Sequence, residues 1–354
     1  MSYKNLQHEV ISVSAVDLSV ICPFYNEGQI IEIAVITLLG KLSELDVNWE
    51  LIVVNDGSQD NSAEIITGLC ATHPRLKMLG YPTNRGRGYA LRTGISQARG
   101  DIIITTEIDL SWGEDIIERL MKAMRDHPEA DIIVASPHVE GGGYKNVPPK
   151  RVFFSKFGNL IIRAFMSNMV TMNTGMTRAY KREVIQALPL EENRKEFHLE
   201  VIMKAQALNY RIYEIPCILE WKDYKHEGLR VQRKSSSKIN NLVVSHTLFS
   251  LFANPVRYVW VTSLAAMLLS AVFLLWSIIR LLSGLVSVFT IIISLTLAII
   301  SIMLFSFGVI AQQGNMIQKE IWTLKQNIQQ LEREIIDNAN SNPEDEIVTK
   351  PDRY

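Results

Sequence analysis

Two long uncharged stretches near the C-terminal end constrain the fold of this chain more than any other feature. Residues 258–279 carry no charged side chain, and neither do residues 285–311. A bilayer core about 30 Å thick needs about 20 helical residues, so each stretch is long enough to cross it. A buried hairpin in a soluble core is the alternative, and it fits these lengths poorly. The sequence therefore predicts a hairpin of two transmembrane helices over residues 256–311.

Basic residues around this hairpin predict its orientation. They precede the first stretch at Arg230, Arg233, Lys234, Lys238 and Arg257, and follow the second at Lys319 and Lys325. Positive charge favours the cytoplasmic side, so we expect both termini and the N-terminal domain in the cytoplasm. The first ten residues contain no apolar run, and we therefore expect no signal peptide.

The N-terminal part of the chain alternates short apolar runs with amphipathic stretches. We expect strands at 18–22, 51–54, 76–79, 102–105 and 132–135, helices near 27–43, 60–71, 86–98 and 113–126, a loop over 136–150, and a helix and a strand within 196–219. Apolar strands that alternate with helices are typical of a parallel sheet covered on both faces. The predicted fold class is α/β, with a mainly parallel sheet in a domain spanning residues 17–237.

Polar clusters follow three of the expected strands directly. They cover residues 23–27, 55–58 and 106–109. Each cluster alone is also ordinary turn or N-cap chemistry. Ligands of parallel sheets bind at the carboxyl ends of the strands, so three clusters at one edge favour a binding site. Glu107 and Asp109 lie two residues apart and can hold a divalent cation, which typically takes one or two carboxylates plus substrate phosphates.

Several functional classes are excluded by what the sequence lacks. The formal net charge of -1 argues against binding nucleic acid through bulk positive charge. The sequence has no phosphate-binding Gly-x-x-x-x-Gly-Lys-Ser/Thr loop, no Gly-x-Gly-x-x-Gly after the first strand and no His-Glu-x-x-His. Cys22, Cys70 and Cys217 are far apart and read as reduced core residues.

The segments that flank the hairpin have patterns of their own. A heptad repeat of Ile317, Ile321, Leu324, Ile328, Leu331 and Ile335 predicts a coiled-coil helix over 315–336, with Glu320 and Lys325 placed to pair between chains. It favours a homo-oligomer, dimer or tetramer, over a helix that packs on its own domain. Residues 151–168 predict a basic, aromatic helix that lies either in a core or on a membrane surface. We expect an extension over 1–16, an interfacial helix over 238–255 and a disordered tail over 337–354.

Read as an ordered set, the motifs resemble the polyprenyl-phosphate sugar synthases of glycosyltransferase family 2. The matching residues are Pro23, Tyr25, Asn26 and Glu27; Val53 to Ser58; Asn84, Gly86, Arg87, Gly88 and Ala90; Glu107 and Asp109; Gly141 to Gly143; Arg151, Ser155 and Asn159; Phe197 and Glu200; and Ser237 and Lys238. The resemblance covers about residues 17–250.

The resemblance implies a GT-A fold and an inverting transfer assisted by Mg²⁺ or Mn²⁺. One sugar would move from a UDP- or GDP-hexose to dolichyl or undecaprenyl phosphate on the cytoplasmic leaflet of a prokaryotic plasma membrane. The implied nucleotide-sugar residues are Pro23, Tyr25, Glu27, Asp56, Arg87, Glu107, Ile108, Asp109 and Glu200. Arg151, Ser155, Lys222, Arg233 and Lys238 would bind the lipid phosphate and diphosphate. Asp109, Glu107 and Ser111 would meet the metal, and Asp109, Arg151 and Ser155 would be catalytic.

The chemistry of a phosphate acceptor agrees with this set. A phosphate monoester has a second pKa near about 6, so it is mostly a dianion at neutral pH and needs no general base. We therefore interpret His138 and His198 as loop or helix histidines rather than catalysts. The two-span hairpin is too small to move a product across the bilayer, so we expect a separate flippase or a downstream glycosyltransferase as partner.

Three residues depart from the family pattern. Glu107 stands where most members have Asp, Ser111 stands where a Gln often helps to bind metal, and Pro137 replaces an arginine near the lipid phosphate. His138, Lys145 or Lys150 would then supply the missing charge. A processive polysaccharide synthase is disfavoured because the chain lacks a Gln-x-x-Arg-Trp element and further spans. A non-catalytic scaffold that binds nucleotide sugar or lipid stays as the alternative from another class.

Overall fold

The computed structural model describes residues 16–150, 152–153, 155–156, 170–221, 224–226, 229–231, 256–285 and 288–341. The chain divides into two compact units. The first comprises residues 1–159 and 170–236, and the second comprises residues 160–169 and 237–354. Each unit is described by itself.

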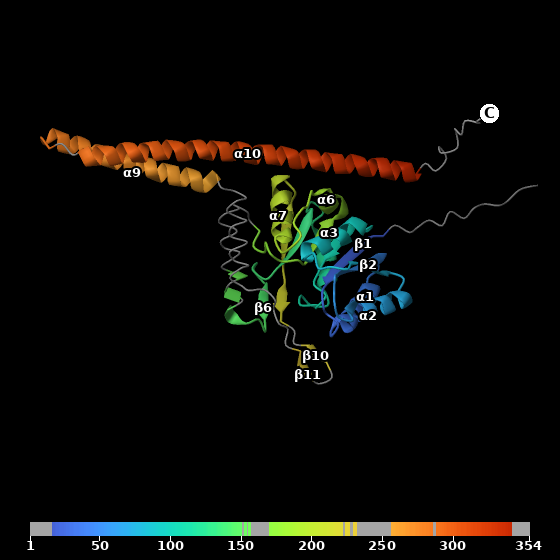
Figure 1. Cartoon of the computed structure of the whole chain (residues 1–354). Coiled ribbons are helices and arrows are strands. Elements are labelled where there is room, and N and C mark those ends of the chain that lie inside the picture. The colour runs from blue at the N-terminus through green and yellow to red at the C-terminus, as the bar shows by residue number, and fades with distance from the viewer. Residues whose placement is uncertain are drawn as a thin grey trace, which may run out of the picture. The chain divides into compact units, whose positions relative to one another are not determined.

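The first unit is built on a seven-stranded sheet with the order β3-β2-β1-β4-β7-β5-β8. Figure 1 labels two of its neighbouring strands, β1 and β2. Its strands are β1 Leu18–Phe24, β2 Trp49–Asp56, β3 Leu76–Tyr81, β4 Ile102–Thr105, β5 Ile132–Ser136, β7 Arg178–Lys181 and β8 Ile212–Pro216. All neighbours pair in parallel except β7, which is antiparallel to both β4 and β5. The prediction of a mainly parallel sheet is confirmed.

Amphipathic helices connect the strands. They are α1 Ile31–Ser43, α2 Ser62–Thr72, α3 Arg87–Gln97, α4 Ile116–Asp126, α6 Arg182–Ala187 and α7 Phe197–Ala207. In α1 the buried side chains recur three or four residues apart, as expected for a helix with one face on a core. α3 can approach the sheet closely because residue 94 is a glycine. A Cβ at Gly94 would lie only 2.5 Å from Cγ2 of Ile21.

The expected strand within 211–219 is instead divided between two sheets. β8 pairs with β5, whereas β9 (Ile218–Glu220) pairs with the short strand β6 (Gly143–Lys145) inside the expected loop. The division falls at Cys217, which donates its N–H to Ser136 and accepts at its carbonyl from Gly143. A further hairpin joins β10 (Tyr224–His226) to β11 (Leu229–Val231).

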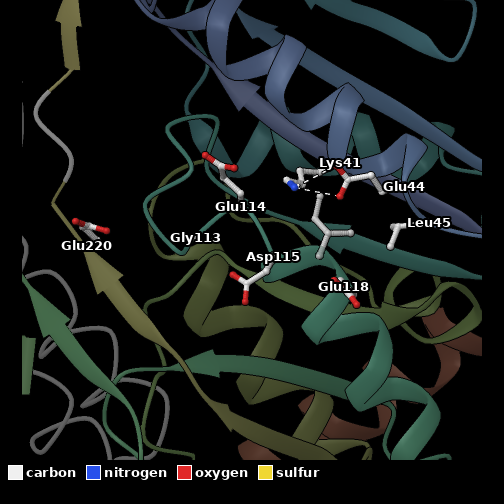
Figure 2. Close-up of a pocket in the computed structure, with 9 residues that line it drawn as sticks. Lys41, Glu44, Leu45, Gly113, Glu114, Asp115, Glu118 and Glu220 are labelled. Carbon is white, nitrogen blue, oxygen red and sulfur yellow. Dashed lines mark hydrogen bonds and ion pairs between the residues drawn. The ribbon is translucent and has the colours of Figure 1, made fainter.

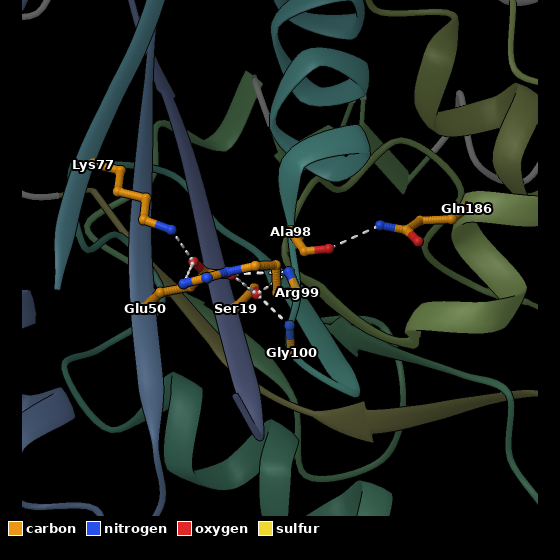
Figure 3. Close-up of polar contacts among 7 residues, drawn as sticks. All are labelled: Ser19, Glu50, Lys77, Ala98, Arg99, Gly100 and Gln186. Carbon is orange, nitrogen blue, oxygen red and sulfur yellow. Dashed lines mark hydrogen bonds and ion pairs between the residues drawn. The ribbon is translucent and has the colours of Figure 1, made fainter. Parts of the chain in front are cut away.

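A buried carboxylate ties three strands together at the amino edge of the sheet (Figure 3). Glu50 accepts hydrogen bonds from Ser19 Oγ at 2.7 Å, from Lys77 Nζ at 2.8 Å and from the backbone N–H of Arg99 at 2.8 Å. Burial opposes ionisation of this carboxyl, but the hydrogen bonds from Lys77, Ser19 and Arg99 leave its pKa below the ordinary value. β1, β2, β3 and the end of α3 are thereby fixed together.

Replacing Glu50 with Gln should lower the free energy of unfolding by about 1–3 kcal/mol, since the donors around this buried position lose a charged acceptor. Because the pKa of Glu50 is lowered on folding, its contribution is complete above the unfolded-state pKa and is lost as pH falls through the folded-state pKa. The difference between wild type and Glu50→Gln should therefore shrink below about pH 4. Denaturant unfolding checks this, with the exposed Glu44→Gln as the control. Equal losses in both variants would contradict the role of Glu50.

The second unit contains two long apolar helices, α9 (Val256–Leu282) and α10 (Val288–Ser341). The segments Val259–Leu282 and Val288–Ile328 have mean hydropathies of 2.2 and 2.7 and are candidate membrane spans by length and composition. α10 runs on without a break through the heptad segment. Residues 337–341 of the expected disordered tail are also helical, which corrects that boundary. The first proline after the span is Pro343, so nothing in the sequence stops the helix earlier.

Three hydroxyl pairs hold α9 and α10 together; their members lie seven residues apart along α9, and seven and then four residues apart along α10. The pairs are Ser263 with Ser301, Ser270 with Ser294, and Ser277 with Thr290. In the first two pairs each hydroxyl donates to the backbone carbonyl of its partner, at 2.8–3.0 Å. Small hydroxyl side chains let two apolar helices approach closely and bond without a hydrophobic driving force. The hairpin therefore buries its polar seam and exposes its large apolar side chains.

Replacing Ser270 with Leu should open this seam, because overpacking a close helix contact costs about 1–3 kcal/mol. We expect slower disulfide formation between cysteines introduced at Ser263 and Ser301 in detergent. The matched control is Ser306→Leu, since Ser306 is exposed and bonds only within its own helix, to Ile302. Unchanged cross-linking in Ser270→Leu would contradict the seam.

Candidate functional site

Three parallel strands bring their polar clusters to the same edge of the sheet. β1 pairs with β2 so that Phe24 lies opposite Asn55, and with β4 so that Ile21 lies opposite Thr105. The segments that follow these strands therefore begin side by side. This convergence is the arrangement that the sequence predicts for a ligand site.

Asp56, the last residue of β2, organises the loop that leads into α3. It is 4% exposed. Its carboxylate accepts from Tyr81 Oη at 2.7 Å, Asn84 Nδ2 at 2.9 Å, and the backbone N–H groups of Arg85 at 2.9 Å and Gly86 at 3.1 Å. Burial and the Asp56 carboxylate together raise the pKa of Tyr81. Both oxygens of Asp56 thus serve the protein's own loop.

The N-terminus of α3 is fixed from two sides. Asp56 supplies negative charge at this helix end, where free N–H groups favour it. Gly86 has φ of +101°, and a Cβ there would lie 2.5 Å from the carbonyl oxygen of Asn193. Tyr89 N–H donates to that same oxygen at 3.0 Å. Arg87 is exposed in the first turn, and burial and this neighbouring guanidinium lower the pKa of Lys195.

Glu200 holds the loop that packs on this helix start. The buried carboxylate accepts from the backbone N–H groups of Glu191 and Glu192, both at 2.9 Å, and from Lys204 Nζ at 2.6 Å. The sequence placed Glu200 with the nucleotide sugar. The structure shows it bonded to this loop, where it positions the backbone next to Asn193.

The loop after β4 carries the two acidic residues expected to meet a metal. Glu107 Oε2 accepts from Trp112 Nε1 at 2.8 Å and from Thr177 Oγ1 at 2.7 Å. Asp109 is 5% exposed, and its Oδ1 accepts from the backbone N–H of Ser111 at 3.0 Å. Ile108 between them is buried. Both carboxylates are therefore held in place from within the loop, and Glu107 is also held by Thr177, which directly precedes β7.

These residues fit a divalent cation that completes its shell with substrate. Over the ranges that the structure covers, no group of three or more His, Cys, Asp or Glu side chains could hold a metal by itself. Asp109 and Glu107 offer two carboxylates, and Mg²⁺ commonly takes one or two in addition to substrate phosphates. The donor set therefore suits a cation that arrives with a diphosphate.

The cluster after β1 is bonded to the loop before α2. Asn26 has φ of +54°, and its N–H donates to Ser58 Oγ at 3.0 Å. Glu27 N–H donates to Ser62 Oγ at 2.9 Å. Tyr25 is 42% exposed, which leaves its ring available to a flat ligand. Pro23, which pairs with Val54 of β2, is half-buried.

The acceptor residues expected from the resemblance are described only in part. Ser155 Oγ lies 3.1 Å from Tyr144 Oη. The remaining expected acceptor residues are all basic and lie outside the described residues. They are Arg151, Lys222, Arg233 and Lys238. Tyr144 was not among the expected site residues, and neither were Tyr81, Trp112 and Thr177. In the sequence, these four residues are marked only as polar or aromatic residues near a motif. Sequence alone does not distinguish such a residue in a site from one in the core.

A cavity of about 620 Å³ adjoins the end of the acidic loop but does not suit a diphosphate (Figure 2). Its polar lining includes the carboxylates of Glu44, Glu114, Asp115, Glu118 and Glu220. Among the described residues that line it, Lys41 is the single basic side chain, and it is paired with Glu44 at 3.0 Å. Such a lining repels anions, so the site is better placed at the sheet edge beside Asp109.

Replacing Asp56 with Asn should destabilise the loop before α3. The amide would present N–H groups to the donors of Arg85 and Gly86, which should lower the free energy of unfolding by about 1–3 kcal/mol. Denaturant unfolding and limited proteolysis of residues 82–86 measure the effect. Asp126→Asn, at the exposed end of α4, is the control and should change little. An equally stable Asp56→Asn protein with an intact loop would show that these bonds are dispensable.

Comparison with known proteins identifies the family of the chain. The family model described as glycosyl transferase family 2 matches residues 19–188. A dolichyl-phosphate beta-glucosyltransferase from Trichomonas vaginalis is 30% identical over 234 residues, which cover 63% of this chain and 68% of that protein. An undecaprenyl-phosphate 4-deoxy-4-formamido-L-arabinose transferase from Photorhabdus laumondii is 30% identical over 48% of this chain and 51% of its own length.

Solved structures share the fold. Glucosyl-3-phosphoglycerate synthase from Mycobacterium tuberculosis, in complex with Mn²⁺, UDP and its product, superposes with a TM-score of 0.50 at 17% identity, over 67% of this chain and 78% of that one. This likeness confirms the expected GT-A fold. The relatives match the polyprenyl-phosphate sugar synthase type to which the motifs pointed, and the chain belongs to glycosyl transferase family 2.

Proposed function

We propose that this protein transfers one sugar from a nucleoside-diphosphate sugar to polyprenyl phosphate at the cytoplasmic face of a membrane. One observation carries the proposal. The loop fixed by Asp56 and the loop that carries Glu107 and Asp109 meet at the carboxyl edge of one sheet, in a chain of family 2. The names of the relatives, which act on dolichyl and undecaprenyl phosphate, support the acceptor class.

The donor half of the site binds and orients the nucleotide sugar. Tyr25 offers an exposed ring to the nucleobase, and Pro23 and Glu27 flank it. Arg87, on the anchored start of α3, faces the charge of the diphosphate. Asp109 and Glu107 would hold Mg²⁺ or Mn²⁺, which supplies charge stabilisation to the leaving nucleoside diphosphate.

The acceptor half needs cations and hydrogen-bond donors rather than a base. The acceptor phosphate is mostly a dianion at neutral pH, because its second pKa is about 6. Ser155 and Arg151 would hold that phosphate, with Lys222, Arg233 and Lys238 adding positive charge. Most of the rate enhancement of such a transfer would come from holding the two anionic substrates in reacting geometry and stabilising their charge.

The second unit would anchor the enzyme. α9 and α10 would span the plasma membrane of a prokaryote with both termini in the cytoplasm, as their flanking basic residues favour. The heptad face of α10 would join copies of the chain into a dimer or tetramer, and its apolar residues, such as Ile321 and Leu324, are exposed in the single chain. A separate flippase would move the product across the membrane.

Replacing Asp109 with Asn should lower transfer by about 10²–10³-fold, since a positioned charge beside the diphosphate is lost. Purified protein, UDP- and GDP-sugars, polyprenyl phosphate and Mg²⁺ or Mn²⁺ would be combined, and the lipid-linked sugar would be measured. Asp101→Asn is the matched control, because Asp101 is 73% exposed and pairs with Arg182.

Full activity of Asp109→Asn would refute its placement in the site. Failure of the wild-type protein to transfer from any donor, despite binding nucleotide, would favour the non-catalytic scaffold. The departures at Ser111 and Pro137 would then be the residues to examine.

A further inference from the structure

Glu107 uses one oxygen of its carboxylate for two hydrogen bonds inside the protein. Its Oε2 accepts from Trp112 Nε1 at 2.8 Å and from Thr177 Oγ1 at 2.7 Å. The direction of the first bond is fixed, because an indole N–H can only donate and an ionised carboxylate can only accept. Among the described residues, no donor bonds to the second oxygen, Oε1. Glu107 therefore has one oxygen held by the fold and one left for a ligand.

Thr177 is fixed in turn by the pairing of β4 with β7. Its Oγ1 lies 3.2 Å from Thr106 Oγ1, and because Thr177 donates its single hydroxyl proton to the carboxylate, Thr106 donates to Thr177. Next to this pair, Thr105 Oγ1 donates to the carbonyl of Met176 at 2.6 Å. Thr105 is the last residue of β4 and lies opposite Arg178, the first residue of β7. The sheet therefore sets the position of the hydroxyl that Thr177 donates.

Trp112 approaches the same oxygen through a turn within the acidic loop. The turn is made at Leu110, which has φ of +51° and is 5% exposed. Leucine rarely adopts this backbone conformation, which persists only where surrounding bonds hold it. Ser111 N–H donates to Asp109 Oδ1 at 3.0 Å, and the carbonyl of Ser111 accepts from Glu220 N–H at 2.7 Å. The buried ring of Trp112 then closes the turn that carries both carboxylates.

We propose that Trp112 and Thr177 are positioning residues for the divalent cation, because they hold Oε2 of Glu107 and leave Oε1 to the metal. This inference rests on the proposed function. Glu107 would then give the cation a single oxygen, in addition to the carboxylate of Asp109 and the diphosphate oxygens of the donor. Hydrogen bonds to a ligating carboxylate set its orientation, and the loss of such a partner typically lowers metal affinity by about 10–100-fold.

A carboxylate that only neutralises a buried cation is the alternative role for Glu107. The cation would be Arg178, whose pKa is lowered by burial, a shift that the charge of Glu107 helps to oppose. The guanidinium of Arg178 nevertheless donates to the carbonyls of His198 and Asn173, at 2.9 Å and 2.8 Å. Since neither bond goes to Glu107, Oε1 is not used by this cation.

The two donors also account for the glutamate at position 107, where the resemblance leads us to expect aspartate. Aspartate is one methylene shorter, so its carboxylate would be withdrawn from Trp112 and Thr177. Glu107→Asp should therefore weaken metal binding in this chain, although it restores the residue of the family pattern.

Equilibrium binding of UDP and of GDP to the full-length protein in detergent tests the proposal without requiring turnover. The measured quantity is the Mn²⁺ concentration that gives half-maximal binding of whichever nucleotide the wild type binds more tightly. This concentration should rise by about 10–100-fold in Trp112→Phe, Thr177→Val and Glu107→Asp. The Kd of the nucleotide in EDTA should be unchanged, because these substitutions act through the metal.

Further variants separate the hydrogen bonds from packing. Thr177→Ser keeps the hydroxyl donor and should need no more Mn²⁺ than the wild type. In Glu107→Gln the amide oxygen can still accept from both donors while the amide nitrogen replaces Oε1, so this variant should fold normally and need about 10–100-fold more Mn²⁺. The matched control for Trp112→Phe is Trp49→Phe, since Trp49 is also buried and its Nε1 has no hydrogen-bond partner among the described residues. It should leave the Mn²⁺ requirement unchanged.

An unchanged Mn²⁺ requirement in Trp112→Phe and Thr177→Val, or an equal rise in Thr177→Ser and Thr177→Val, would overturn the proposal. A wild-type requirement in Glu107→Gln would also overturn it, and so would nucleotide binding by the wild type that does not depend on metal. Thermal unfolding in EDTA identifies any variant that fails to fold, and Glu107→Gln and Glu107→Asp then decide the outcome.

The expected shifts in a protein that transfers sugar from no donor would refute the proposed function and leave the metal site standing. Binding of neither UDP nor GDP by the wild type in the presence of Mn²⁺ would refute both.

Discussion

The carboxylate of Asp56 is the interaction on which the site depends. Asp56 is the last residue of β2. Its carboxylate accepts a hydrogen bond from Tyr81, the last residue of β3, and from the backbone N–H groups of Arg85 and Gly86, where α3 begins. Two strands and one helix are thereby joined at a single buried group. The exposed start of α3, with Arg87, is held on one side by this charge, which the loop itself satisfies. Glu200 repeats the arrangement from the other side, through the loop that contains Asn193.

Much of the fold could be predicted because its central strands are continuously apolar. Strands such as β1 and β2 are buried on both faces, and their sequences are therefore apolar at most positions. β7 could not be predicted, since it has four residues and its first, Arg178, is a fully buried guanidinium that donates to the carbonyls of His198 and Asn173. The pairing of β8 and β9 with different sheets depends on contacts distant in sequence, which periodicity does not contain.

For the candidate site, the sequence predicts which positions come together, but it does not predict the hydrogen bonds among them. The convergence of three polar clusters follows from strand order alone. That Glu107 reaches Trp112 and Thr177 requires the position of β7, and that Ser155 reaches Tyr144 requires β6. The longer side chain of Glu107, at the position where the resemblance leads us to expect Asp, carries its carboxylate to these two donors. This departure from the family pattern is therefore matched by two hydrogen-bond donors in the structure. The sequence alone shows the departure but not these donors.

We propose above all that a donor nucleotide binds at the carboxyl edge of the sheet, between Tyr25, the loop held by Asp56, and Asp109. The most direct measurement is a structure of the protein solved with UDP and Mn²⁺ and, in parallel, with GDP and Mn²⁺. We expect the base beside Tyr25, the diphosphate near Arg87 and the cation on Asp109 in at least one complex. A nucleotide bound elsewhere, or a cation that does not contact Asp109, would contradict the account.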